Sequence, residues 1–214
     1  MWSSFGMSSK GIISGTWCPY GAWSIIILAN PAASFAVNRF HNDLKSQGIA
    51  VGKDSLHEFL ACLEDAYLIQ TVFLDSSSLR RQQVNPRKIY PVDPGLSSAF
   101  RHVSCLDRGR LLETLVFLDL RRRGLSVTYF RSRDGFEVDF LASGPTGERE
   151  AVQVSETLAD PPTRLREFRA IEVLMEERDV AVATVVTLDE EESVDTRFGR
   201  VEVVPVWRWL LRRE

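Results

Sequence analysis

Residues 134–140 read DGFEVDF, a turn signal followed by a strict alternation of apolar and polar side chains. Asp-Gly favours a tight hairpin turn, and the alternation is typical of a half-buried β-strand. In an extended strand, Glu137 and Asp139 share one face and lie roughly 6.6–7 Å apart. The apolar residues from Phe136 to Phe140 are expected on the opposite face. The strand therefore places a pair of carboxylates on one surface of the predicted sheet.

The segments around this strand predict a mixed sheet covered by helices. Residues 151–155 alternate as a second strand, which puts Gln153 and Ser155 on one face. Two helices are expected, one opening at the N-cap residue Asp107 and stopping at Gly124, the other opening at Asp160. The remaining predicted elements are a strand over 125–131, buried strands over 180–188 and 201–206, and a short tryptophan-containing helix at the C-terminus.

Glu113 stands on the apolar side of the first of these helices, almost in line with Leu120. A carboxylate there is costly to bury unless it is paired or bound to a cation. One interpretation is a rim glutamate paired with a nearby arginine. The other combines Glu113 with Asp139 and the side-chain oxygen of Gln153 as a hard-oxygen site, for which Mg²⁺ is the expected metal.

The first third of the chain has the element order of a winged helix-turn-helix. Ser34 is expected to cap a helix that ends at Gly48, and Ser55 with Glu58 forms a predicted capping box. A strand over 69–74 and a short strand around 88–90 follow. Acidic side chains on the second helix would repel a DNA backbone, which argues against base reading by that helix.

The N-terminal segment carries no charge over residues 11–38 and contains a strongly apolar run. We expect a buried helix over 22–30 behind an atypical leader, residues 1–24; a signal peptide is the alternative interpretation. Glycine, proline and asparagine interrupt the run, so a membrane span is not expected.

The 214 residues carry a net charge of −3, but the charge is segregated along the chain. Residues 76–134 hold 12 basic and 5 acidic side chains, whereas residues 135–194 hold 5 basic and 15 acidic ones. The basic segment either binds phosphates or pairs with the acidic segment of the same fold. Its candidate nucleic-acid-binding residues are Arg80, Arg81, Arg87, Lys88, Arg121, Arg122, Arg123 and Arg133. Three scattered cysteines, without a C-x-x-C pair, suit a reducing cytoplasm.

Five passages together resemble the C-terminal half of a group of prokaryotic AAA-type ATPases. In order, they are FAVNRFHNDLKSQGIAVGKDSLHEFLACLEDAYLI, NPRKIYPVDPGL, GRLLETLVFLDLRRRG, YFRSRDGFEVDFL and VPVWRWLL. In that group, an ATPase module precedes a winged helix and a domain of unknown function with a PD-(D/E)XK nuclease-like fold. The resemblance implies a mixed α/β fold: a winged helix-turn-helix followed by a restriction-endonuclease-like core with a central mixed sheet.

Two departures from that pattern bear on function. The sequence contains no G-x-x-x-x-G-K-[ST] motif, so ATP is not an expected ligand of this chain. Where the nuclease motif places Glu-x-Lys, this chain has Gln153-Val154-Ser155. Ser155 cannot supply the ammonium that stabilises charge in phosphodiester cleavage. Lys88 and Arg133 are the basic residues that could take that role from elsewhere in the chain.

The expected organisation is the leader, a winged-helix-like module over 25–92 and a nuclease-like domain over 93–214. We expect a catalytically degenerate accessory module in the cytoplasm, with DNA, an ATPase subunit or another protein as partner, and no membrane contact. A Mg²⁺-dependent nuclease with a modified site is the alternative. A decayed or truncated gene without a maintained role is the third interpretation.

Overall fold

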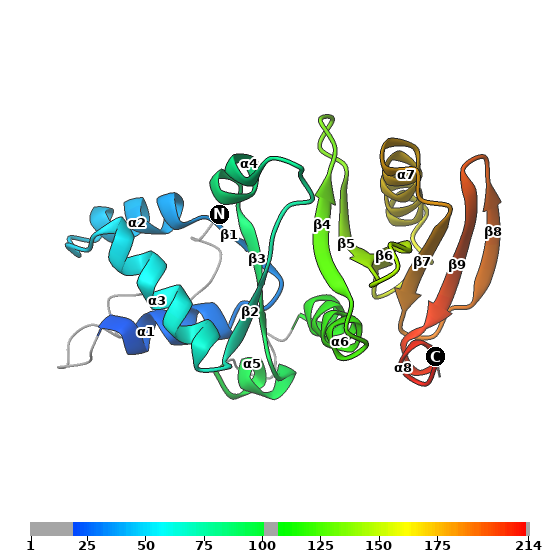
Figure 1. Cartoon of the computed structure of the whole chain (residues 1–214). Helices are drawn as coiled ribbons and strands as arrows, with labels where there is room; N and C mark the ends of the chain where they lie inside the picture. Colours follow the sequence, from blue (N-terminus) through cyan, green and yellow to red (C-terminus); the bar gives the residue numbers. More distant parts are fainter. Residues whose placement is uncertain (1–18, 101–106, 213–214) are drawn as a thin grey trace.

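The computed structural model describes residues 19–100 and 107–212, which form two units placed side by side (Figure 1). The N-terminal unit, residues 19–100, has a small sheet flanked by helices. The C-terminal unit, residues 107–212, has a larger sheet with helices on both faces. The predicted fold class, a mixed α/β protein with a central mixed sheet, is confirmed. Predictions that fall within residues 1–18 lie outside the described residues.

The N-terminal unit packs three helices against a three-stranded antiparallel sheet of order β1-β3-β2. Its apolar core joins Trp23 of α1 to Phe40 of α2 and Phe59 of α3, with ring centroids 6.1 and 5.7 Å from that of Trp23. The buried helix expected over 22–30 is present as α1. The elements are α1 (Pro19–Leu28), β1 (Ala33–Phe35), α2 (Val37–Ser46), α3 (Lys53–Asp65), β2 (Ile69–Val72), α4 (Leu79–Val84), β3 (Arg87–Pro91) and α5 (Pro94–Phe100).

Two predicted helix caps of this unit are wrong. Ser34 lies in β1, where it pairs with Lys88 of β3, and α2 begins at Val37. The ladder to β3 satisfies the backbone of this segment, so the chain stays extended past the expected cap. Ser55 lies inside α3, which begins at Lys53 with Gly52 in the cap position and no side-chain cap bond.

The C-terminal unit is built on a six-stranded sheet of order β4-β5-β6-β7-β9-β8. The central strands β6, β7 and β9 run parallel, and the flanking pairs are antiparallel. Helices α6 and α8 pack against one face, and α7 covers the other. The elements are α6 (Arg108–Arg122), β4 (Ser126–Arg131), β5 (Glu137–Ser143), β6 (Arg149–Val154), α7 (Pro161–Arg178), β7 (Val182–Thr187), β8 (Glu192–Thr196), β9 (Gly199–Pro205) and α8 (Val206–Leu210).

The predicted ends of these elements are confirmed where a local hydrogen bond or backbone angle fixes them. Asp107 accepts from the Arg110 N–H, and Asp160 accepts from the Thr163 N–H. Gly135 adopts a φ of 89° in the β4–β5 turn, as the Asp-Gly signal indicates. Both features depend on a few neighbouring residues, which is why they are visible in sequence.

The strict alternation predicted for β5 is broken by a bulge. Thr128 pairs with Leu141 and Phe130 with Val138, so Tyr129 alone faces both Asp139 and Phe140. As a result Phe140 joins Tyr90 and Phe117 in the core under α6, whereas Val138 lies in the core under α7. The prediction that Phe140 shares a face with Val138 is therefore wrong. The bulge keeps Asp139 and Phe140 on the same side of the sheet.

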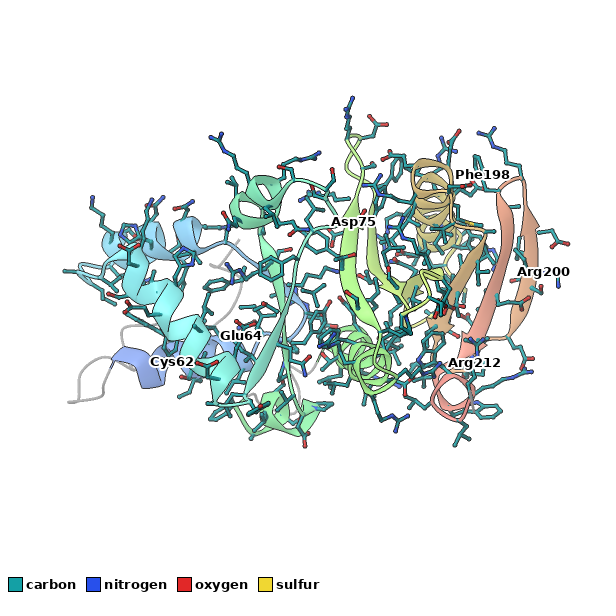
Figure 2. The ribbon with its side chains drawn as sticks, viewed as in Figure 1. Cys62, Glu64, Asp75, Phe198, Arg200 and Arg212 are labelled. Atoms are coloured by element: carbon teal, nitrogen blue, oxygen red, sulfur yellow. The ribbon has the colours of Figure 1, made fainter. Side chains whose placement is uncertain are left out.

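The two units are joined by main-chain contacts at the edge of the large sheet. The Tyr129 N–H donates to the Phe73 carbonyl at 3.0 Å, and the Asp75 N–H donates to the Tyr129 carbonyl at 2.7 Å. Asp75, labelled beside β4 in Figure 2, also pairs with Arg149 and Arg178. Segment 73–75 therefore extends the C-terminal sheet beyond β4. Among the described residues, no helix has the length and hydropathy of a bilayer-spanning segment.

The helix caps give a direct test of these element boundaries. Asp160→Ala should lower the free energy of unfolding by about 1 kcal/mol, because it leaves the Thr163 N–H without its acceptor. Ser55→Ala should change it by less than about 0.5 kcal/mol, because Ser55 caps nothing. Urea denaturation of both variants measures the difference. A larger loss of unfolding free energy in Ser55→Ala than in Asp160→Ala would contradict the start of α3 at Lys53 and support the predicted capping box.

Candidate functional site

The ammonium group of Lys88 lies among three carboxylates at the junction of the two units. Its Nζ is 2.8 Å from Asp139 Oδ1, 3.1 Å from Glu113 Oε1 and 3.1 Å from Glu137 Oε1. Lys88 is 4% exposed, so water does little to screen these charges. Lysine is almost never buried without paired charges, and here the C-terminal unit supplies all three. We call these four residues the Lys88 cluster.

Strand β3 brings Lys88 and Tyr90 to the same face, toward α6. The Tyr90 hydroxyl donates to Glu113 Oε1 at 2.7 Å, the same oxygen that accepts from Lys88. The Tyr90 ring stacks on Phe117, one turn along α6 from Glu113, with centroids 4.3 Å apart. Apolar packing therefore holds the two donors in register with the carboxylate.

Asp139 is fixed by the neighbouring strand as well as by Lys88. Its Oδ2 accepts from the Val154 N–H at 3.0 Å, and its own N–H donates to Gln153 Oε1 at 3.0 Å. The Gln153 amide nitrogen donates to Glu167 Oε2 at 2.6 Å, and Glu167 pairs with Arg166. Both polar atoms of Gln153 are thus bonded to partners other than Glu113 and Lys88.

Burial and neighbouring charge shift the protonation of this cluster. Burial, together with the negative charge of Asp139, raises the pKa of Glu113 to about 7, although Lys88 and Tyr90 pull it down. Burial would lower the pKa of Lys88, but Asp139, Glu113 and Glu137 outweigh it and hold that pKa well above its usual range. Lys88 therefore stays charged, and Glu113 titrates close to neutral pH.

The structure brings together two of the three residues predicted to bind metal. Glu113 and Asp139 meet at Lys88, whereas the Gln153 oxygen is turned to the backbone of Asp139. Within residues 19–100 and 107–212, no group of three or more His, Cys, Asp or Glu side chains is arranged to hold a metal ion. Ser155 donates to the Thr157 carbonyl and takes no part in the cluster.

The sequence indicated the acidic members of the cluster and named Lys88 in two ways, as a candidate phosphate binder and as a residue that could replace the missing nuclease lysine. A signal was present, since Lys88 and Tyr90 share one face of a short predicted strand. The sequence did not show which residues pack against that face, because Glu113 lies 25 residues and Asp139 51 residues further along the chain.

The predicted basic residues separate into two groups. Arg121, Arg122 and Arg123 lie at the C-terminal end of α6, where they bond within the C-terminal unit and to Gln70 of β2. Arg123 also donates to the Trp209 carbonyl and lies over the Trp209 ring. Exposed Arg80, Arg81 and Arg133 and half-buried Arg87 have no ion-pair partner within the described part of the chain. Arg122 and Arg123 pair with Asp119 of the basic segment itself, so among the described residues pairing with the acidic segment accounts for Lys88 and Arg108 only.

Comparison with known proteins gives two similarities. Residues 108–209 match the family described as a domain of unknown function, DUF4143. An uncharacterized protein of the archaeon Methanocaldococcus jannaschii, MJ1544, is 29% identical over 191 residues, which cover 84% of this chain and 41% of that protein. The chain therefore spans about two fifths of the length of this relative. No solved structure matches the chain.

The raised pKa of Glu113 predicts a defined pH dependence of stability. Glu113 binds its proton more tightly in the folded state than in the unfolded state. Its contribution to the free energy of unfolding is therefore fully present below about pH 4.5 and is lost as pH rises toward 7. The free energy of unfolding should fall over this window by on the order of 2 kcal/mol more in the wild type than in Glu113→Gln. Urea denaturation between pH 4.5 and 7.5 measures this difference.

The control is Glu58→Gln on the exposed face of α3, which should keep the wild-type profile. Parallel profiles for the wild type and Glu113→Gln would contradict the assignment of this titration to Glu113.

Proposed function

We propose that this chain is an accessory module with a nuclease-like core that does not cleave phosphodiesters and serves binding instead. The observation that carries the proposal is the position of Lys88, whose ammonium lies between Glu113 and Asp139. These are the carboxylates that a metal-dependent nuclease of the resembled fold would direct at its metal. In this chain a buried internal cation lies between them.

The bonding around Asp139 supports a structural role for the cluster. Lys88 and the Val154 N–H occupy its two oxygens, and Gln153 holds its backbone. A divalent cation at this point would lie against a buried ammonium, and repulsion between like charges disfavours that arrangement. Gln153 also lacks the second negative charge that a hard cation prefers. Lys88 therefore offsets part of the negative charge of the cluster, and the hydrogen bonds to Asp139 hold that carboxylate in place without a bound ion.

We place the module within a larger ATPase-linked protein. The five passages that resemble AAA-type ATPases lie in both units, and the archaeal relative is more than twice as long as the matched region. The ATP-binding half of that family has no counterpart in this chain, because a P-loop motif is missing from the sequence. Nucleotide hydrolysis would belong to another segment or subunit.

A Mg²⁺-dependent nuclease is the second candidate function, and one specific observation favours it. Ser155 cannot supply the ammonium of the nuclease motif, but Lys88 places one 2.8 Å from Asp139. A lysine recruited from β3 would then stabilise the charge that develops on the scissile phosphate. This candidate requires Lys88 to leave Asp139 partly free for a metal.

Calorimetry with Mg²⁺ and Mn²⁺, followed by a cleavage assay on plasmid and single-stranded DNA, separates the two candidates. We expect no saturable metal binding to the wild type and no cleavage above that of Asp139→Asn, because the Lys88 ammonium already lies between the carboxylates. Metal-dependent cleavage that disappears in both Asp139→Asn and Lys88→Gln would overturn the proposal in favour of the nuclease. Circular dichroism of each variant confirms that it is folded.

A further inference from the structure

Helix α4, residues Leu79–Val84, buries none of its side chains. Leu79 is 74% exposed and Val84 69% exposed. The helix is held by its ends, because Ser78 accepts from the Arg81 N–H and Gln82 donates to the Ser76 carbonyl. Helices in proteins owe most of their stability to packing on one face, so a helix fixed only by local bonds is available to another molecule.

Both ends of the α4 segment return to one residue of the large sheet, Tyr129 of β4. The backbone of segment 73–75 pairs with Tyr129 before the helix, and the Tyr129 hydroxyl donates to the Pro86 carbonyl at 2.6 Å after it. Arg131, the last residue of β4, lies roughly 7 Å from Tyr129 along the strand, and Arg133 follows in the hairpin turn. Figure 1 accordingly shows α4 and the β4–β5 hairpin turn along the upper edge of the molecule, on the two sides of the junction.

The side of the junction that carries α4 and the β4–β5 turn has a group of arginines whose charge is not neutralised by the protein. Within the described residues, these arginines form no ion pair. The Arg87 guanidinium lies 4.9 Å over the Phe73 ring. The nearby carboxylate Asp75 is already paired with Arg149 and Arg178, and Glu137, the register partner of Arg131, is paired with Lys88, which leaves Asp134 in the hairpin turn as an opposing charge. We call this set the arginine surface, comprising Arg80, Arg81, Arg87, Arg131 and Arg133.

Several arginines elsewhere on the surface do have ion-pair partners. Arg200, at the far side of the C-terminal unit in Figure 2, pairs with Asp195 and lies near Glu202. Arg164 pairs with Glu192. Exposed Arg39 and Arg212 also lack an ion-pair partner within the described residues, so what distinguishes the side that carries α4 is the grouping of five arginines without such a partner.

We propose that the arginine surface binds the phosphate backbone of nucleic acid without reading its sequence. Guanidinium groups match phosphate oxygens in fork geometry, and grouped cations release counterions from a polyanion on binding. The second helix of the winged-helix order, α3, exposes Glu58 and Asp65 and would repel phosphates. Binding thus uses a short helix and a hairpin of the junction. The inference rests on the proposed function and names the partner of that module.

The test is fluorescence anisotropy of the full chain with a 20-base-pair DNA duplex and an RNA hairpin, in EDTA from 50 to 200 mM salt. With four to five phosphate contacts, affinity for the duplex should fall by roughly 10²-fold over this range. The variant Arg80→Gln/Arg81→Gln/Arg131→Gln/Arg133→Gln should reduce the slope of log affinity against log salt by roughly 3–4. These four side chains are exposed, so the variant should keep the wild-type fold.

The matched control carries Arg164→Gln and Arg200→Gln, which remove one half-buried and one exposed arginine, both ion-paired, and should retain the wild-type slope. An unchanged slope of log affinity against log salt in the fourfold variant would contradict the assignment of phosphate binding to the arginine surface. The absence of binding to either nucleic acid at 50 mM salt would also overturn it, and would leave an acidic protein face as the partner. EDTA keeps this result independent of the cleavage assay, so the binding surface and the non-hydrolytic role can fail separately.

Discussion

The buried ammonium of Lys88 is the constraint on which the arrangement of the two units depends. It comes from β3 of the N-terminal unit, and the carboxylates that neutralise it come from α6 and β5 of the C-terminal unit. A buried charge without its partners is strongly unfavourable, so separating the units would require hydration of all four groups. The cluster therefore ties the small sheet to a particular position on the large one.

Other features of the junction support that position. Tyr90 satisfies Glu113 from the same strand and stacks on Phe117, while the bulge in β5 keeps Asp139 and Phe140 facing β3. The main chain of 73–75 continues the C-terminal sheet past β4. Apolar packing, backbone pairing and the ion cluster thus agree on one interface. Lys88 lies where the two units meet, between the two carboxylates that the sequence predicted to bind metal.

The sequence predicted what short-range chemistry determines. Asp107, Asp160 and Gly135 specify helix starts and a turn through their nearest neighbours, and the carboxylates at 113 and 139 were recognised as a pair. It failed where long-range pairing decides, as at Ser34, which the ladder to β3 keeps extended. It also failed at Phe140, because a bulge leaves no mark in a pattern of alternation. Lys88 was named as a candidate, but its burial among three carboxylates was not predicted, because those partners lie on another unit.

The most direct test of this account is a double-mutant cycle between Lys88 and Asp139. Lys88→Met alone should lower the free energy of unfolding by about 3–5 kcal/mol, since it leaves buried carboxylates uncompensated. Urea denaturation of Lys88→Met, Asp139→Asn and the double variant at pH 7.5 should give a coupling energy above about 1.5 kcal/mol. Lys45→Met, an exposed lysine of α2, serves as the control. Additive effects, with coupling below about 0.3 kcal/mol, would contradict the account.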